Sequence, residues 1–134
     1  MTIKPSSERS FRIAALFTAI NVLVASGFSI AGLISPRSIL PVNAVTTQAS
    51  LIFAMYAAAR TIPLAAVTLV IIVKRHVSAL LVLGILAGFV QAADTLIGLY
   101  QQDLGKSLGP FVLATFQFVV VRSLYNASKS ESAA

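Results

Sequence analysis

An arginine and an aspartate lie inside long apolar stretches of this sequence, where ionisable side chains are rare. Arg60 is the only charged residue of the run 48–73, and Asp94 is the only charged residue of the run 77–100. A charge at mid-depth in a bilayer costs several kcal/mol unless it is paired or hydrated. Because an Arg–Asp pair is nearly neutral, we expect these two side chains to meet in an intramembrane ion pair.

The same two groups could also carry out chemistry. Asp94 would serve as the acid or base, and Arg60 would bind an oxyanion or a carboxylate. Tyr56 lies one helical turn before Arg60 on the same face, so it is a candidate proton donor. The candidate catalytic residues are therefore Asp94, Arg60 and Tyr56.

Three amide side chains are expected at a similar depth. At 1.5 Å per residue, Asn21, Gln91 and Gln117 lie roughly 12–18 Å from the outer ends of their apolar runs. We expect them to bind a ligand in a polar pocket that opens toward the non-cytoplasmic face. In the alternative interpretation, these groups bond to one another and hold the helices together.

The elements that position these residues follow from the composition. Hydrophobic residues make up 57% of the 134 residues and charged residues 10%, against about 25% charged in soluble domains. This excludes a soluble monomer and a disordered chain. Since a spanning helix needs about 20 apolar residues, the sequence predicts four transmembrane helices, over residues 13–34, 48–73, 77–100 and 108–125.

The predicted fold class is an all-α integral membrane four-helix bundle of up-down-up-down order, a single domain over residues 1–134. Pro110 is expected in the first turn of the last helix, and the chain after residue 125 is expected to be loose.

The first apolar run is longer than the core of a signal peptide, so we expect it to be retained.

The distribution of Lys and Arg predicts the orientation of the chain in the membrane. One side would carry Lys4, Arg9, Arg12, Lys74, Arg75, Arg122 and Lys129, and the other only Arg37 and Lys106. Cytoplasmic loops are enriched in Lys and Arg, so both termini are predicted to be cytoplasmic. The predicted location is the bacterial inner membrane or an equivalent membrane, with multiple spans.

Other classes of site have little support in the sequence. The chain has no cysteine and one histidine, so we expect no metal site and no cofactor. No basic patch larger than a short turn is present, which argues against a nucleic-acid partner. Gly84 and Gly88 have a GxxxG spacing that favours close helix packing, either within the bundle, which we prefer, or in a homo-oligomer.

Short motifs in this sequence resemble those of the DoxX-like small four-helix membrane proteins. The segments are Ala58-Ala59-Arg60-Thr61-Ile62-Pro63, Ala92-Ala93-Asp94 and Ser35-Pro36-Arg37. The chain departs from the group at Thr61, which stands where an acid is usual, and at Pro63. The resemblance implies a four-helix fold. Some relatives are linked to quinone-dependent oxidation, while other small four-helix membrane families include cofactor-free oxygenases and isomerases.

Three functions remain open. The first is a binding or accessory component in the lipid bilayer, whose polar pocket receives a lipid, a quinone-like molecule or a partner subunit. The alternative is a membrane-embedded enzyme (oxygenase, oxidoreductase or isomerase) that acts on a hydrophobic small molecule with Asp94 as acid/base. A proton-coupled exporter ranks last, because the run 13–34 has no acidic residue.

Overall fold

The computed structural model describes residues 5–41 and 43–132, with side chains for residues 7–37, 39–41 and 43–130. Lys4, which entered the charge comparison above, lies outside these ranges. The helices are α1 (Pro5–Ile34), α2 (Gln48–Val73), α3 (Val77–Tyr100) and α4 (Leu104–Ser132), with a short 3-10 helix η1 (Pro36–Ser38) after α1.

The all-α four-helix prediction is confirmed. The described ranges contain no strand, and each of the four helices includes a stretch long and apolar enough to cross a membrane. Helices α2 and α3 have the predicted bounds. The start of α2 is fixed by a capping box, in which the Thr47 hydroxyl accepts from the Ser50 N–H and the Ser50 hydroxyl accepts from the Thr47 N–H.

Helix α4 is longer at both ends than predicted. The Asp103 carboxylate accepts from the backbone N–H of Lys106 at 3.1 Å and so caps a helix that begins at Leu104. This bond also lowers the pKa of Asp103. Pro110 therefore lies inside the helix rather than in its first turn. The expectation of a loose tail after residue 125 is also wrong, because no Pro or Gly interrupts the polar continuation to Ser132.

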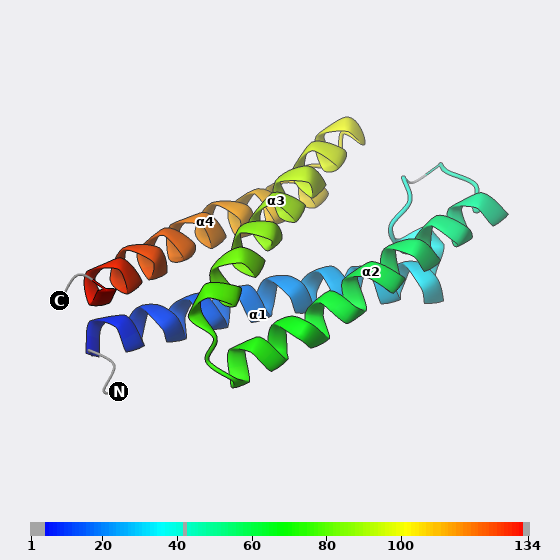
Figure 1. Ribbon diagram of the computed structural model, residues 1–134. Coiled ribbons are helices and arrows are strands. Elements are labelled where there is room, and N and C mark those ends of the chain that lie inside the picture. The colour runs from blue at the N-terminus through cyan, green and yellow to red at the C-terminus, as the bar shows by residue number, and fades with distance from the viewer. Residues whose placement is uncertain (1–4, 42, 133–134) are drawn as a thin grey trace.

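The helices form two hairpins, α1–α2 and α3–α4 (Figure 1). Helix α1 packs against both α2 and α4, and α3 packs mainly against α4. Helices α2 and α3 contact each other little and diverge from the short turn that joins them. The two termini lie side by side at one end of the molecule (Figure 1).

Polar contacts tie together the connections at each end of the bundle. At the end that carries the termini, the Glu8 carboxylate accepts from Arg12 at 2.9 Å and pairs with Arg75 in the α2–α3 turn. At the other end, the Lys106 ammonium donates to the Ile39 carbonyl oxygen in the α1–α2 connection at 3.1 Å. Successive connections between helices therefore lie at opposite ends of the bundle, as an up-down-up-down order requires.

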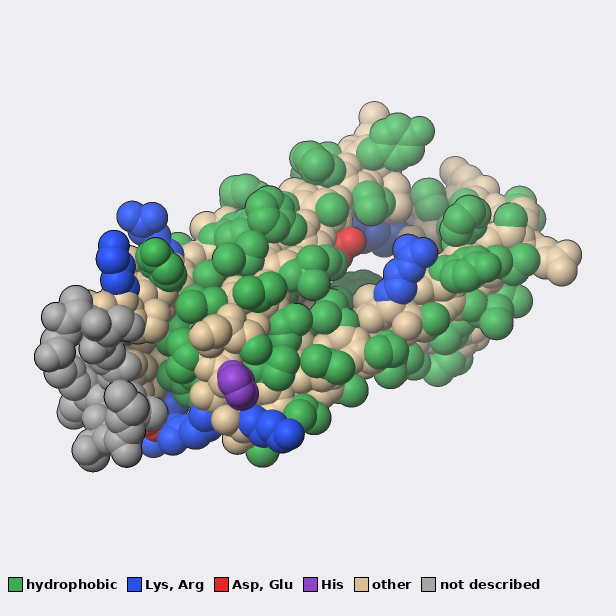
Figure 2. Space-filling model, viewed as in Figure 1, with side chains coloured by type: hydrophobic (Ala, Val, Ile, Leu, Met, Phe, Trp, Pro, Cys, Tyr) green, Lys and Arg blue, Asp and Glu red, His purple; other side chains and the backbone are tan. Residues whose placement is uncertain are grey.

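The buried core is small for a chain of this length, and much apolar surface faces outward. Figure 2 shows hydrophobic side chains over most of the face that it displays. Phe53 and Val82, for example, are 73% and 66% exposed. Four helices of membrane-spanning length with such faces suit a lipid environment. The largest buried cluster comprises Phe11, Ala14, Ala15, Leu80, Val120 and Leu124.

Glycines bring α3 and α4 together. A Cβ on Gly84 would lie 2.6 Å from Val121 Cγ2, and one on Gly98 would lie 2.5 Å from the backbone oxygen of Lys106. The Lys106 oxygen accepts no helical hydrogen bond from the residue four positions later, because that residue is Pro110 and has no N–H. The preferred interpretation of the GxxxG spacing, packing within the bundle, is confirmed at Gly84 and Gly88, which both face α4 side chains.

We expect Gly98→Ala to destabilise the fold by about 1–3 kcal/mol, because the new methyl group forces the α3 and α4 backbones apart. The matched control is Gly27→Ala in α1, where a Cβ meets no atom within 4 Å. Reversible unfolding in mixed micelles measures both free energies. Equal effects of the two substitutions would show that the α3–α4 approach is not tight.

Candidate functional site

Three of the predicted pocket residues form one buried hydrogen-bond network. Gln91 Nε2 donates to Asn21 Oδ1 at 2.7 Å, and Asn21 Nδ2 donates to Gln117 Oε1 at 3.3 Å. Gln117 Nε2 in turn donates to Thr18 Oγ1 at 2.8 Å. All four side chains are buried. The network joins α1, α3 and α4, so the prediction that these amides share one layer is confirmed.

The network uses most of its own polar atoms. Both polar atoms of Asn21 and of Gln117 are used within it. Among the described side chains, no buried nitrogen or oxygen lacks a hydrogen-bond partner. This supports the interpretation in which the amides hold the helices together. A direct ligand-binding role for Asn21, Gln91 and Gln117 stays a prediction.

Sequence reasoning missed Thr18. It lies three residues before Asn21 and therefore on the same face of α1, a spacing that could have identified it. Threonine is a weak signal in an apolar helix, because its hydroxyl commonly bonds a carbonyl of its own helix. Gly84 faces this network, since a Cβ there would lie 3.0 Å from Gln117 Nε2.

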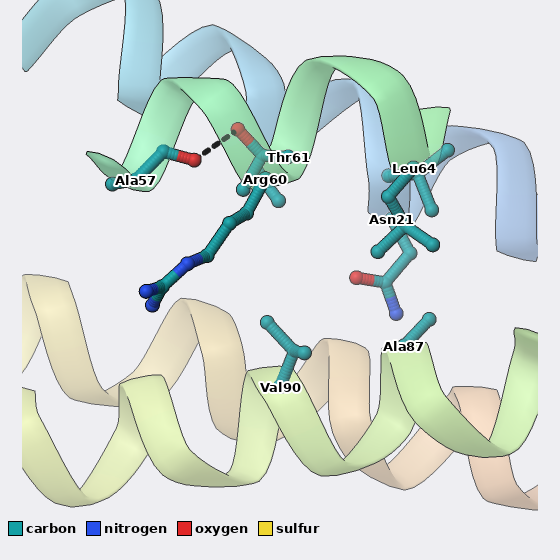
Figure 3. A pocket seen from close by; sticks show the side chains of 9 residues that line it. Asn21, Ala57, Arg60, Thr61, Leu64, Ala87 and Val90 are labelled. Atoms are coloured by element: carbon teal, nitrogen blue, oxygen red, sulfur yellow. Dashed lines mark hydrogen bonds between the residues drawn. The ribbon is translucent and has the colours of Figure 1, made fainter. Parts of the chain in front are cut away.

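Hydroxyl groups join α1 to α2 beside Arg60. The Ser26 hydroxyl donates to the Thr61 carbonyl oxygen at 3.1 Å, and the Thr61 hydroxyl donates to Ser29 Oγ at 2.9 Å. The same Thr61 hydroxyl also lies 3.1 Å from the Ala57 carbonyl oxygen (Figure 3). These bonds fix the register of the two helices and thus the position of Arg60.

A cleft of about 230 Å³ lies between α2 and α3, with α1 as its floor. In Figure 3 the Arg60 side chain extends from α2 across this space toward α3, while Val90 faces it from α3. The other lining residues are largely Ala, Val and Leu, and the full set is Asn21, Val22, Ala25, Ala57, Arg60, Thr61, Leu64, Ala87 and Val90. The cleft is thus apolar, with one cation.

The predicted Arg60–Asp94 ion pair is not confirmed. Among the described side chains the salt bridges are Glu8–Arg12, Glu8–Arg75 and Asp103–Lys106, and neither Arg60 nor Asp94 takes part in a pair within 4.0 Å. The prediction was based on the similar depth of Arg60 and Asp94 along their helices. Because α2 and α3 diverge, a similar depth does not bring the two side chains together. Figure 2 shows a hollow between the two hairpins with acidic and basic side chains beside it.

The predicted catalytic residues are not gathered in one place. Asp94 is half-buried and lies one turn beyond Val90, on the same face of α3 but outside the cleft lining. Tyr56 is 59% exposed and is also outside the lining. Their catalytic roles stay predictions. No three His, Asp or Glu side chains gather within the described ranges, so these ranges offer no metal-ligand set.

Comparison with known proteins adds no assignment. No family model matches the chain, and neither the curated proteins nor the solved structures contain a significant match to it. The DoxX-like resemblance therefore rests on the short sequence motifs alone.

We expect Asn21→Leu to destabilise the bundle more than Thr18→Val. The first substitution leaves two amide side chains without their partner, whereas the second removes one bond at the end of the network. The expected losses are about 1–3 kcal/mol for Asn21→Leu and about 0.6 kcal/mol for Thr18→Val. Unfolding in mixed micelles measures both, and the reverse order would contradict a network centred on Asn21.

We expect Arg60→Met and Asp94→Leu to act independently on stability, because the two side chains form no ion pair. A double-mutant cycle on thermal unfolding in detergent should give a coupling energy within about 0.5 kcal/mol of zero. A coupling of several times that size, with the double variant more stable than either single variant, would restore the ion-pair prediction.

Proposed function

We propose that the protein is a membrane-embedded binding component, which holds a lipid or a quinone-like molecule in the cleft between α2 and α3. One observation carries the proposal. Arg60 lies within a membrane-spanning stretch and lines an apolar cleft, yet its guanidinium has no salt-bridge partner among the described side chains.

A guanidinium in this position favours a bound molecule that accepts hydrogen bonds. It carries five N–H donors and stays protonated, and leaving it unpaired in an apolar region costs several kcal/mol. Asn21, which also lines the cleft, accepts from Gln91, and within the described ranges Arg60 donates no hydrogen bond to it. A carbonyl, carboxylate or phosphate oxygen of a bound molecule would supply the missing partner.

The size and position of the cleft suit a molecule that is only partly enclosed. Its volume of about 230 Å³ is below the range of about 300–1,000 Å³ that is typical of sites enclosing a drug-sized ligand. The cleft lies where α2 and α3 diverge and contact each other little. A polar head group or ring would occupy it, and an apolar tail would remain in the surrounding lipid.

The enzyme hypothesis requires more than the cleft provides. It places Asp94, Arg60 and Tyr56 around one substrate, whereas only Arg60 lines the cleft. The binding proposal needs only the cleft and its cation, and we therefore favour it. The resemblance to DoxX-like proteins, whose motifs include Arg60, is the reason to keep a quinone among the possible ligands. A partner subunit whose helix fills the cleft is the other occupant.

The orientation belongs to the same proposal. The end of the bundle that carries the termini also carries Arg9, Arg12, Lys74 and Arg75, whereas the opposite end carries Arg37 and Lys106. By the positive-inside rule, the termini lie in the cytoplasm. The α2 and α3 residues that line the cleft lie at the middle of those helices, so the cleft would lie near mid-depth in a bacterial inner membrane or an equivalent one.

We expect Ala57→Phe to reduce the amount of lipid or quinone that binds to the purified protein by about tenfold or more, because the ring fills the cleft that Ala57 lines. Native mass spectrometry after detergent extraction measures the bound molecules. Ala59→Phe is the matched control, since Ala59 is an exposed α2 residue outside the lining. Equal binding by both variants would contradict the cleft as the binding site.

A further inference from the structure

We infer that the ligand of the cleft is a single-chain amphiphile with a carboxylate head, which binds Arg60 and reaches it sideways from the bilayer between α2 and α3. The inference rests on the proposed function and specifies the ligand class. Four features carry it: the charge of the cleft, the shape of its cation, its volume and the small contact between α2 and α3.

The charge of the cleft favours a monoanion. Its lining contains one arginine and no Asp or Glu. Within the described side chains, no carboxylate lies within salt-bridge distance of Arg60. A carboxylate leaves the occupied cleft neutral, which an apolar surrounding favours. A neutral quinone leaves the positive charge uncompensated, and a phosphate monoester with about −1.5 to −2 charges overcompensates it.

The shape of the guanidinium favours the same head group. Its planar fork donates two parallel N–H···O bonds to the two oxygens of a carboxylate. In Figure 3 the end of the Arg60 side chain lies free in the space between α2 and α3, with no dashed line to a neighbouring side chain. Asn21 bonds to Gln91 and Gln117 in the amide network, so Arg60 supplies the charge that would select the head group.

The volume favours one hydrocarbon chain. A space of about 230 Å³, smaller than a typical enclosed ligand site, accepts a carboxylate and the first part of one chain. A phospholipid presents two chains and a glycerol group at its phosphate. The walls beside Arg60 are Ala57, Leu64, Ala87 and Val90, side chains that suit a hydrocarbon tail.

The helices α2 and α3 are joined at one end of the bundle and are separate along the rest of their length. At one end, α2 and α3 are joined by a short turn in which Arg75 pairs with Glu8. At the other end, the Lys106 ammonium donates to the carbonyl oxygens of Ile39 and Leu40 and so holds the α1–α2 connection to the start of α4. The gap between α2 and α3, which contact each other little, remains as the lateral path.

The experiment compares four probes on the full-length protein in phosphatidylcholine nanodiscs: oleate, oleyl alcohol, oleoyl lysophosphatidate and decylubiquinone. Oleate and oleyl alcohol share one chain and differ in charge. We expect oleate to bind on the order of 10- to 100-fold more tightly than oleyl alcohol, the range for charge-assisted hydrogen bonds. Tighter binding of oleyl alcohol, lysophosphatidate or decylubiquinone than of oleate would overturn the inference.

Variants assign the preference to Arg60. Arg60→Gln should abolish the preference for oleate over oleyl alcohol, and Arg60→Lys, which keeps the charge and loses the fork, should retain part of it. Arg37→Gln, in the connection after α1, is the control and should leave the preference unchanged. A preference that survives Arg60→Gln, with the fold verified by circular dichroism, would overturn the inference.

The same measurements separate this inference from the proposed function. If decylubiquinone binds most tightly and Ala57→Phe blocks it, the cleft is the binding site and only the carboxylate assignment fails. If no probe binds, or if binding is unaffected by Ala57→Phe, the proposed function itself fails.

Discussion

Lipid tails form no hydrogen bonds, so a donor or acceptor buried among them has no partner. The polar side chains within these helices must therefore bond to one another. Most of this bundle meets that requirement internally. The amide network centred on Asn21 joins three helices, and the hydroxyl contacts around Thr61 join α2 to α1. Arg60 and Asp94 are exceptions, since neither takes part in a salt bridge among the described side chains, and the Arg60 guanidinium points into a cleft.

The cleft follows from an unequal distribution of close helix contacts. Gly84, Gly88 and Gly98 let α3 approach α4 until a methyl group would clash with α4 atoms. Contacts between α2 and α3 are few by comparison. The α3–α4 hairpin therefore stays together as it diverges from α2 (Figure 1). The packing that stabilises one hairpin thus also opens the space beside the other.

The sequence predicted those features that depend on position along a helix. Uninterrupted apolar runs defined α2 and α3, and depth arithmetic placed Asn21, Gln91 and Gln117 in one layer. The depth arithmetic failed for the Arg60–Asp94 pair. Those residues lie on two helices that diverge, and depth alone gives neither the separation of two helices nor the direction of a side chain. The start of α4 was misplaced because Pro110 was given more weight than the cap at Asp103.

The location of the unpaired cation on α2 has a structural reason. This helix contributes no side chain to the amide network, and its register is held by Thr61, the residue next to Arg60. A cation on α1, α3 or α4 at this depth would compete with the network for its acceptors. On α2, Arg60 can exchange partners without breaking the contacts between helices. The proposed exchange of partners at Arg60 would thereby leave the hydrogen bonds between the helices in place.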